Sequence, residues 1–195
     1  MRRKLLNIFF KLMFPILKIF GQIYAPWSRK LITYEMAWDC YSAATPGDII
    51  LRTRYGEFSN ILIAGKYKHV AMVYDHDHCI HSVTPVVSKI AIYDYLMQGD
   101  KIALVRPKGL LESQRQQAAE FSKSLLGKPY DFNFNLPSLD SYNEALYCSE
   151  LPHWCYMKTK KYTNYKYEPK EILGQKAIHP DDYLNQKYFE TIREY

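Results

Sequence analysis

The distribution of hydrophobic and polar residues divides the chain into two units. Residues 5–27 are strongly apolar, yet lysines recur in and next to this segment at seven-residue intervals: Lys4, Lys11 and Lys18. At 100° per residue these lysines fall on one narrow stripe of a helix. We therefore expect a basic amphipathic helix over residues 1–30 and a globular domain over residues 31–195.

Shorter apolar segments of the globular domain predict a mixture of strands and helices. Runs rich in β-branched and aromatic residues predict strands at 48–54, 68–74, 79–86, 87–92 and 101–106. Apolar periodicity and helix-ending signals predict helices at 36–43, 113–126 and 151–158. The remaining segments are expected to be a helix or turn at 58–64, a surface loop at 162–167, and a turn into a short helix at 178–184. This pattern indicates an α+β domain.

A polar turn joins two of the predicted strands and decides which side chains share a face. If the loop is Asp75 to Asp77, Ala71 lies opposite His81. His69 and His81 are then diagonal neighbours on one face, roughly 7–8 Å apart. A slip of one residue would place them on opposite faces. The pattern therefore predicts a pair of imidazoles in this hairpin.

The segment Tyr147-Cys148-Ser149-Glu150-Leu151 places a cysteine just before a predicted helix. Unpaired N–H groups and the positive end of the helix dipole favour a thiolate at such a position. A cysteine nucleophile also needs a base and a group that orients the base, which His69 and His81 can supply. A buried structural thiol is the alternative, and spacing alone does not choose between the two.

Four motifs in this order are similar to a known family. The motifs are Pro46-Gly47-Asp48-Ile49-Ile50, Lys68-His69-Val70, Gly127-Lys128-Pro129-Tyr130-Asp131-Phe132 and Tyr147-Cys148-Ser149-Glu150. Together they resemble the YiiX-like, circularly permuted papain-like hydrolases, relatives of the NlpC-type peptidases and of lecithin:retinol acyltransferase. The resemblance covers roughly residues 44–185. It implies a circularly permuted papain-like (NlpC-type) fold, with an antiparallel sheet packed against the helix that follows the nucleophile.

The resemblance also implies roles for four residues. Cys148 is expected as the nucleophile and His69 as the base, with the histidine earlier in the chain as the permuted order requires. Tyr130 is expected to help bind the oxyanion or the substrate. His81 stands where close relatives have a glutamate, although NlpC-type enzymes use a histidine as the third polar residue. A neutral His81 can orient His69 but stabilises an imidazolium less than a carboxylate does.

Composition narrows the expected partners. The chain has 195 residues, 18 tyrosines, nine phenylalanines and a net charge of +6, which suit a small domain with anionic or lipid-like partners. It has no zinc finger, Gly-x-x-Gly loop or arginine stripe, so we expect no nucleic-acid partner. The basic N-terminal helix is best explained by attachment to an anionic membrane interface. A signal peptide, a tilted spanning helix and a helix packed on the domain stay open, as does the compartment.

Other clusters have simpler explanations than catalysis. Four residues of one hairpin are potential zinc ligands: His76, His78, Cys79 and His81. Alternate residues of a strand point to opposite faces, so this tract offers only two or three well-placed ligands, and a solvated hairpin tip is favoured over zinc. Cys148 and Cys155 lie too far apart on a helix to pair, at roughly 10.5 Å of rise, and most thiols are expected to be free. Asp48 and Asp131 are expected to cap turns.

The sequence thus predicts a membrane-associated cysteine hydrolase or acyltransferase that acts on an amide or ester and needs no cofactor or metal. Its substrate is expected to be a cell-wall peptide, an N-acyl amino acid or another lipid-like molecule. The alternative is a papain-like scaffold of low catalytic power that binds lipid or peptide at a membrane surface.

Overall fold

The computed structural model describes residues 31–57, 60, 63, 65–131, 144–159, 170–172 and 175–195. The predicted helix over residues 1–30, the predicted loop at 162–167 and most of segment 58–64 lie outside these residues. Among the helices that are described, none has the length and apolar character needed to cross a membrane.

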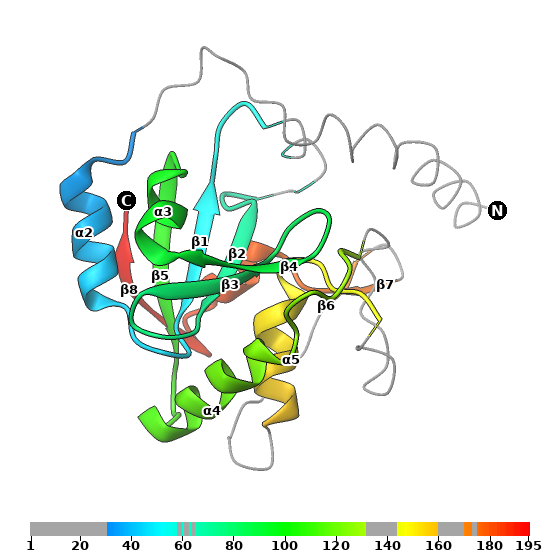
Figure 1. Ribbon diagram of the computed structural model, residues 1–195. Coiled ribbons are helices and arrows are strands. Elements are labelled where there is room, and N and C mark those ends of the chain that lie inside the picture. The colour runs from blue at the N-terminus through cyan, green and yellow to red at the C-terminus, as the bar shows by residue number, and fades with distance from the viewer. Residues whose placement is uncertain are drawn as a thin grey trace.

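A six-stranded sheet forms the centre of the domain (Figure 1). Its strands are β1 (Ile49–Thr53), β2 (His69–Val73), β3 (His78–Ser82), β4 (Val87–Ala91), β5 (Lys101–Pro107) and β8 (Phe189–Glu194). The strand order is β4-β3-β2-β1-β5-β8, and every neighbouring pair is antiparallel. Two further strands, β6 (Lys170–Ile172) and β7 (Gln175–Ala177), pair separately.

Helices cover both faces of this sheet (Figure 1). On one face lie α2 (Tyr34–Ala43) and α3 (Ile92–Met97), and on the other lie α4 (Glu112–Lys123) and α5 (Glu150–Lys158). A short 3-10 helix, η2 (Pro180–Leu184), comes between β7 and β8. The arrangement confirms the predicted α+β class.

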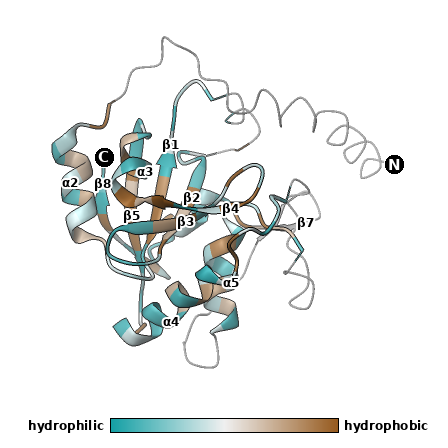
Figure 2. Cartoon of the chain, in the orientation of Figure 1, coloured by the Kyte–Doolittle hydropathy of each residue, from teal (hydrophilic) through white to brown (hydrophobic). Residues whose placement is uncertain are grey.

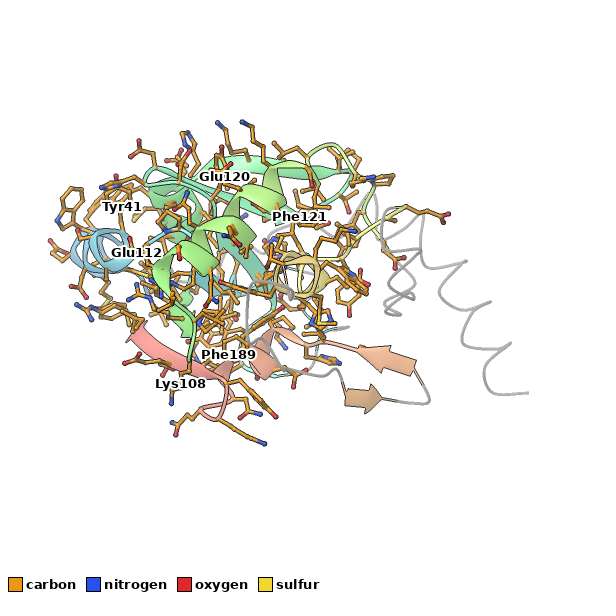
Figure 3. The ribbon with its side chains drawn as sticks, turned by 90° about the horizontal axis from the view of Figure 1, so that it is seen from below. Tyr41, Lys108, Glu112, Glu120, Phe121 and Phe189 are labelled. Carbon is orange, nitrogen blue, oxygen red and sulfur yellow. The ribbon has the colours of Figure 1, made fainter. Side chains whose placement is uncertain are left out.

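The two-residue period of the strands supplies a separate core to each helical layer. Ile50, Ala71 and Leu104 pack with the helices α2 and α3. Leu51 and Val70 face the other way and pack with α5 and α4. Both faces of the sheet are therefore apolar, whereas α4 is largely hydrophilic (Figure 2). Phe121 lies on the side of α4 that faces α5 (Figure 3).

Local signals explain where elements begin and turn. The Thr33 hydroxyl accepts the Met36 N–H at 3.3 Å, so α2 begins at residue 34, two residues earlier than predicted. In the hairpin, Asp75 Oδ1 accepts the N–H groups of Asp77 and His78 at 2.9 and 2.7 Å. This turn fixes the ladder in the predicted register, which is confirmed.

Some predicted boundaries were wrong, and some elements were missed. The strand expected to reach Val86 ends at Ser82, because the chain turns through Pro85, which has no N–H for a ladder. The helix expected to reach Leu126 ends at Lys123, and residues 124–127 form turns. Three missed elements are α3, which is only six residues long, and the strand pair β6–β7. The edge strand β8 was missed as well.

Candidate active site

The candidate nucleophile lies in a closed turn at the start of α5. The N–H of Glu150 donates to the Tyr147 carbonyl at 3.2 Å, and the N–H of Tyr147 donates to Glu150 Oε2 at 3.0 Å. This reciprocal pair encloses Cys148 and Ser149, so Cys148 lies two residues before the first helical residue. Pro152 falls in the first turn, where a missing N–H costs little. The predicted position of Cys148 next to a helix N-terminus is confirmed.

The Cys148 thiol is buried, and burial dominates its ionisation. Burial raises its pKa above the ordinary value. The Ser149 hydroxyl, 3.8 Å from the sulfur, and the nearby N–H of Val70 act in the opposite direction. The thiol is therefore protonated at neutral pH, so the expected thiolate at the helix N-terminus is not the resting form.

The two histidines of the hairpin contact each other. The register places Ala71 opposite His81, with His69 as the first residue of β2. His69 Nε2 lies 3.0 Å from His81 Nδ1, and the two rings are almost perpendicular. A hydrogen bond from the protonated Nε2 of His69 to His81 Nδ1 leaves Nδ1 of His69 with a free lone pair.

Cys148 approaches the sheet where β2 and β3 separate. Their ladder ends at Ala71 and His81, so Val70, next to His69, can turn its N–H toward the Cys148 sulfur. The Ser82 hydroxyl on β3 instead donates to the carbonyl of Leu146, two residues before the cysteine. The structure thus brings the cysteine turn and the histidine pair to one end of the hairpin. Within the described residues, no hydrogen bond joins the Cys148 thiol directly to the His69 ring.

A buried arginine next to the histidines was not anticipated. Arg52 is the cross-strand partner of His69, and its guanidinium lies 4.3 Å from the centre of the Tyr95 ring. Its Nη1 donates to Gln98 Oε1 at 2.7 Å and to the Tyr95 carbonyl at 3.3 Å. In the described part of the chain, no carboxylate forms an ion pair with it. A cation within the apolar run of β1 is the only sequence signal that pointed to it.

Burial and Arg52 keep both imidazoles neutral. Burial, followed by the charges of Arg52 and His81, lowers the pKa of His69 well below its ordinary value. Burial and then Arg52 lower the pKa of His81 to about 4. Tyr95 encloses the pair, with its ring centre 6.0 Å from that of His69 and 5.5 Å from that of His81. At neutral pH the site therefore holds a thiol and two neutral imidazoles.

Tyr130 lies in the segment that flanks the cysteine turn. Its backbone bridges to Leu146, and its N–H donates to the Pro85 carbonyl at 3.0 Å. Burial, and next the negative charge that Cys148 would carry, raise the pKa of the Tyr130 phenol well above its ordinary value. The phenol is therefore protonated and can donate a hydrogen bond, and a negative charge on Cys148 would disfavour its ionisation further. Its expected role in binding an oxyanion or substrate stays a prediction.

Other candidate residues have structural positions. His76 is exposed at the hairpin tip, where the Tyr41 hydroxyl reaches Asp77 at 2.9 Å. No group of three His, Cys, Asp or Glu side chains in the described residues is arranged to hold a metal ion. All four cysteines are buried and free. Asp48 accepts the Thr45 N–H at 2.9 Å and pairs with Arg106 at 2.7 Å, so it caps a turn as expected.

Comparison with known proteins decides the family. A family model described as "Permuted papain-like amidase enzyme, YaeF/YiiX, C92 family" matches residues 34–193. The chain belongs to this family. Membership of the permuted papain-like amidases accounts for a histidine strand that precedes the cysteine helix, and it identifies the chain coarsely as a cysteine hydrolase. The predicted family resemblance and fold are confirmed.

Solved structures agree with the fold of this amidase family. The crystal structure of the metalloprotein yiiX from Escherichia coli O157:H7 matches with a TM-score of 0.61 at 20% sequence identity. The match covers 77% of this chain and 97% of the E. coli chain. At this identity the similarity shows the shared fold alone. No curated protein matches the sequence.

Proposed function

We propose that this protein hydrolyses an amide through an acyl-enzyme formed on Cys148. The observation that supports this most is the placement of the cysteine turn at the end of the β2–β3 ladder, next to the histidine pair. Membership of an amidase family supports the choice of an amide. The residues that carry out the reaction are Cys148, His69, His81 and Tyr130.

The neutral resting state sets the order of proton transfer. As the sulfur of Cys148 attacks the substrate carbonyl carbon, Nδ1 of His69 takes the thiol proton, and the carbonyl oxygen becomes an oxyanion. The Nε2–H of His69 donates to His81 throughout, which holds the ring in the tautomer that acts as a base. His69 next protonates the leaving amine as the C–N bond breaks. Water then attacks the thioester while His69 removes its proton, and the thiol of Cys148 leaves with that proton.

The oxyanion needs donors that are in place before the reaction. The Tyr130 hydroxyl and the backbone N–H of Cys148 are the proposed donors. The pKa of Tyr130 is raised, so its hydroxyl remains protonated while negative charge develops close by. The reciprocal hydrogen bonds between Tyr147 and Glu150 keep the backbone of Cys148 rigid.

We further propose a lipid-like or membrane-proximal substrate, such as an N-acyl amino acid, with the enzyme attached to an anionic membrane by residues 1–30. Support comes from the basic amphipathic pattern of that segment and from an aromatic surface directly after it. This surface, the α2 face, comprises Leu31, Tyr34 and Trp38, which are 53%, 69% and 61% exposed. Exposed tyrosine and tryptophan suit the boundary between water and lipid.

Two finer alternatives belong to this proposal. An acyltransferase would release the acyl group to an amine or alcohol instead of water, and product analysis with and without such an acceptor separates the two. A binding scaffold is favoured by one observation, the neutral His81 in place of an acid. The E. coli relative is described as a metalloprotein. In the described residues of this chain, no third ligand joins His69 and His81, so we assign no step to a metal.

The deciding experiment is alkylation of Cys148 by iodoacetamide, followed by mass spectrometry across a pH series, in wild type and in His69→Ala. Wild-type Cys148 is expected to react faster than in His69→Ala at neutral pH, because the imidazole takes up the thiol proton. Cys40, Cys79 and Cys155 are internal controls, since burial raises the pKa of each thiol. Equal rates in the two proteins would favour the binding scaffold.

A further inference from the structure

One short segment contacts both halves of the candidate site. The segment comprises Ile178, His179 and the 3-10 helix η2, and we refer to it as the clamp segment. Asp182 Oδ2 accepts the N–H of His179 at 2.9 Å, which fixes the entry into η2. The neighbouring Asp181 and Tyr183 reach away from this turn and contact different parts of the protein.

Asp181 binds the backbone immediately before the histidine strand. Its Oδ2 accepts the N–H of Lys66 at 2.5 Å, and its Oδ1 accepts the N–H of Tyr67 at 2.7 Å. The next residue, Lys68, donates its N–H to the Arg52 carbonyl at 3.0 Å. The N–H groups of three consecutive residues, 66 to 68, are therefore all hydrogen-bonded, which fixes the backbone immediately before His69.

The backbone at residue 65 is built to receive this carboxylate. Gly65 has a φ of +99°, and a Cβ at this position would lie 2.3 Å from Asp181 Oδ2. A side chain is excluded there by both the conformation and the contact. The close approach of Asp181 to this loop is thus a specific feature of the chain and not incidental surface packing.

The same segment contacts the residues on both sides of Cys148. The Tyr183 hydroxyl donates to the Ser149 carbonyl at 2.6 Å. The N–H of Ile178 donates to the Tyr147 hydroxyl at 3.0 Å. All of these groups are buried, so water does not compete for the hydrogen bonds. The distal end of the segment is secured by Tyr183 packing edge to face on Phe189 of β8, with ring centres 5.2 Å apart.

We propose that Asp181 and Tyr183 are positioning residues that hold the His69 strand and the Cys148 turn in register across the site. The proposal rests on the function proposed above. Neither side chain contacts the reacting atoms, and each acts through the backbone that carries a reacting residue. His69 lies on a strand of the sheet and Cys148 lies in the turn before a helix that packs on the sheet, so contacts from one segment to the backbones beside both residues help to fix their separation. A misplacement of about 1 Å between reacting groups lowers rates by about a hundredfold.

The test is a double-mutant comparison in the full chain. Iodoacetamide alkylation of Cys148 at neutral pH is measured for wild type, Asp181→Ala, His69→Ala and the double variant. Asp181→Ala is expected to lower the rate roughly ten- to hundredfold. It is expected to have no further effect once His69 is absent, because Asp181 acts through His69. An equal loss in both backgrounds, or no loss at all, would overturn the proposal.

Matched variants separate positioning from general destabilisation. Asp39→Ala removes a carboxylate that binds Arg193 and Tyr195 on the α2 side, and it is expected to leave alkylation unchanged. Tyr183→Phe should slow alkylation, whereas Tyr156→Phe, which removes a buried hydroxyl that donates to the Gly47 carbonyl, should not. If Asp181→Ala does not fold, Asp181→Asn takes its place with the same expected outcomes.

The design also distinguishes failure of the two proposals. Equal rates of Cys148 alkylation in wild type and in His69→Ala would refute the Cys148–His69 pair. The positioning proposal, which depends on that pair, would then be refuted as well. A clear dependence on His69 that Asp181→Ala leaves intact would overturn positioning alone.

Discussion

Arg52 adds to burial in keeping the histidine pair neutral. The guanidinium lies on the strand next to His69, stacked on Tyr95, and no carboxylate in the described part of the chain neutralises it through an ion pair. Its charge adds to burial in lowering the pKa of both His69 and His81. A cysteine–histidine ion pair is therefore disfavoured at rest, and the thiol must lose its proton during attack.

Arg52→Gln is expected to move the acid limb of the pH profile to higher pH. Without the guanidinium the pKa of His69 rises, so the imidazole becomes protonated, and useless as a base, at a higher pH during acidification. The dependence of the alkylation rate of Cys148 on pH measures this. Arg52→Lys keeps the charge and should leave the limb close to its wild-type position. A limb that does not move in Arg52→Gln contradicts the electrostatic role of Arg52.

For single residues, the sequence predicted those contacts that depend only on strand alternation and on short turns. The diagonal placement of His69 and His81 depends only on strand alternation and on a short polar turn, so the hairpin pattern was enough. The environment of Arg52 depends on α3 and Gln98, which lie more than forty residues along the chain. No local pattern encodes such a contact. The raised pKa of the Cys148 thiol could not be predicted from a local pattern either, because its burial depends on residues from the whole core.

Among the elements, α5 begins with a carboxyl group in an unusual state. Glu150 is fully buried and accepts the Tyr147 N–H, and burial raises its pKa to about 9 from 4.5. The nearby Asp131 raises the pKa further, whereas the hydrogen bond from Tyr147 lowers it. In the folded protein this side chain is therefore a neutral acid at neutral pH, and it acts as a neutral acceptor for the cysteine turn.

Glu150→Gln is expected to stabilise the fold increasingly as the pH rises. The folded carboxyl binds a proton that the unfolded chain releases above about 4.5, so its contribution to stability is lost as the pH rises through about 9. Glutamine keeps an acceptor for Tyr147 and does not titrate. Thermal unfolding should show a melting temperature a few degrees above wild type in mildly alkaline buffer. The difference should shrink toward zero below about pH 4.5.

The exposed Glu112 in the first turn of α4 is a matched control for this change (Figure 3). Because the Glu112 side chain is exposed, Glu112→Gln should not give the rise in melting temperature that is expected of Glu150→Gln in alkaline buffer. A pH-independent effect of Glu150→Gln would contradict the raised pKa of its carboxyl in the folded protein.

Element types were predictable where the pattern was long, and boundaries were not. The helix containing Ala118 and Ala119 was recognised from its periodicity, yet its end was placed three residues too late, because the turns after Lys123 continue the apolar pattern. Helix α3 follows β4 without a polar break, and its residues Ile92 and Tyr93 suit a strand equally well. The Ile92 N–H still donates to the Asp77 carbonyl at 2.8 Å, in register with the β3–β4 ladder, so the strand and the helix meet without a break.

For the molecule as a whole, the α2 face and residues 1–30 together define the proposed membrane side. The full chain is expected to sediment with anionic vesicles containing phosphatidylserine, and the variant lacking residues 1–30 is not. Trp38→Ser should weaken binding, because the exposed indole follows the basic segment directly. Binding should also weaken as salt increases.

Leu111→Ser provides the matched control, since Leu111 is 68% exposed at the start of α4, on the opposite helical layer. Its vesicle binding should equal that of wild type. Equal binding by the full chain and by the variant without residues 1–30 would remove the attachment proposal. The enzymatic proposal would remain.

The position of the clamp segment along the chain bears on when an enzyme of this kind becomes competent during its synthesis. A growing chain acquires His69 and then Cys148 well before it acquires residues 178–184. Until that stretch has emerged and docked, nothing from it can bind Lys66, Tyr67 or Ser149. A nascent polypeptide would thus hold its reactive residues in an inactive arrangement until residues 178–184 have been synthesised and have docked.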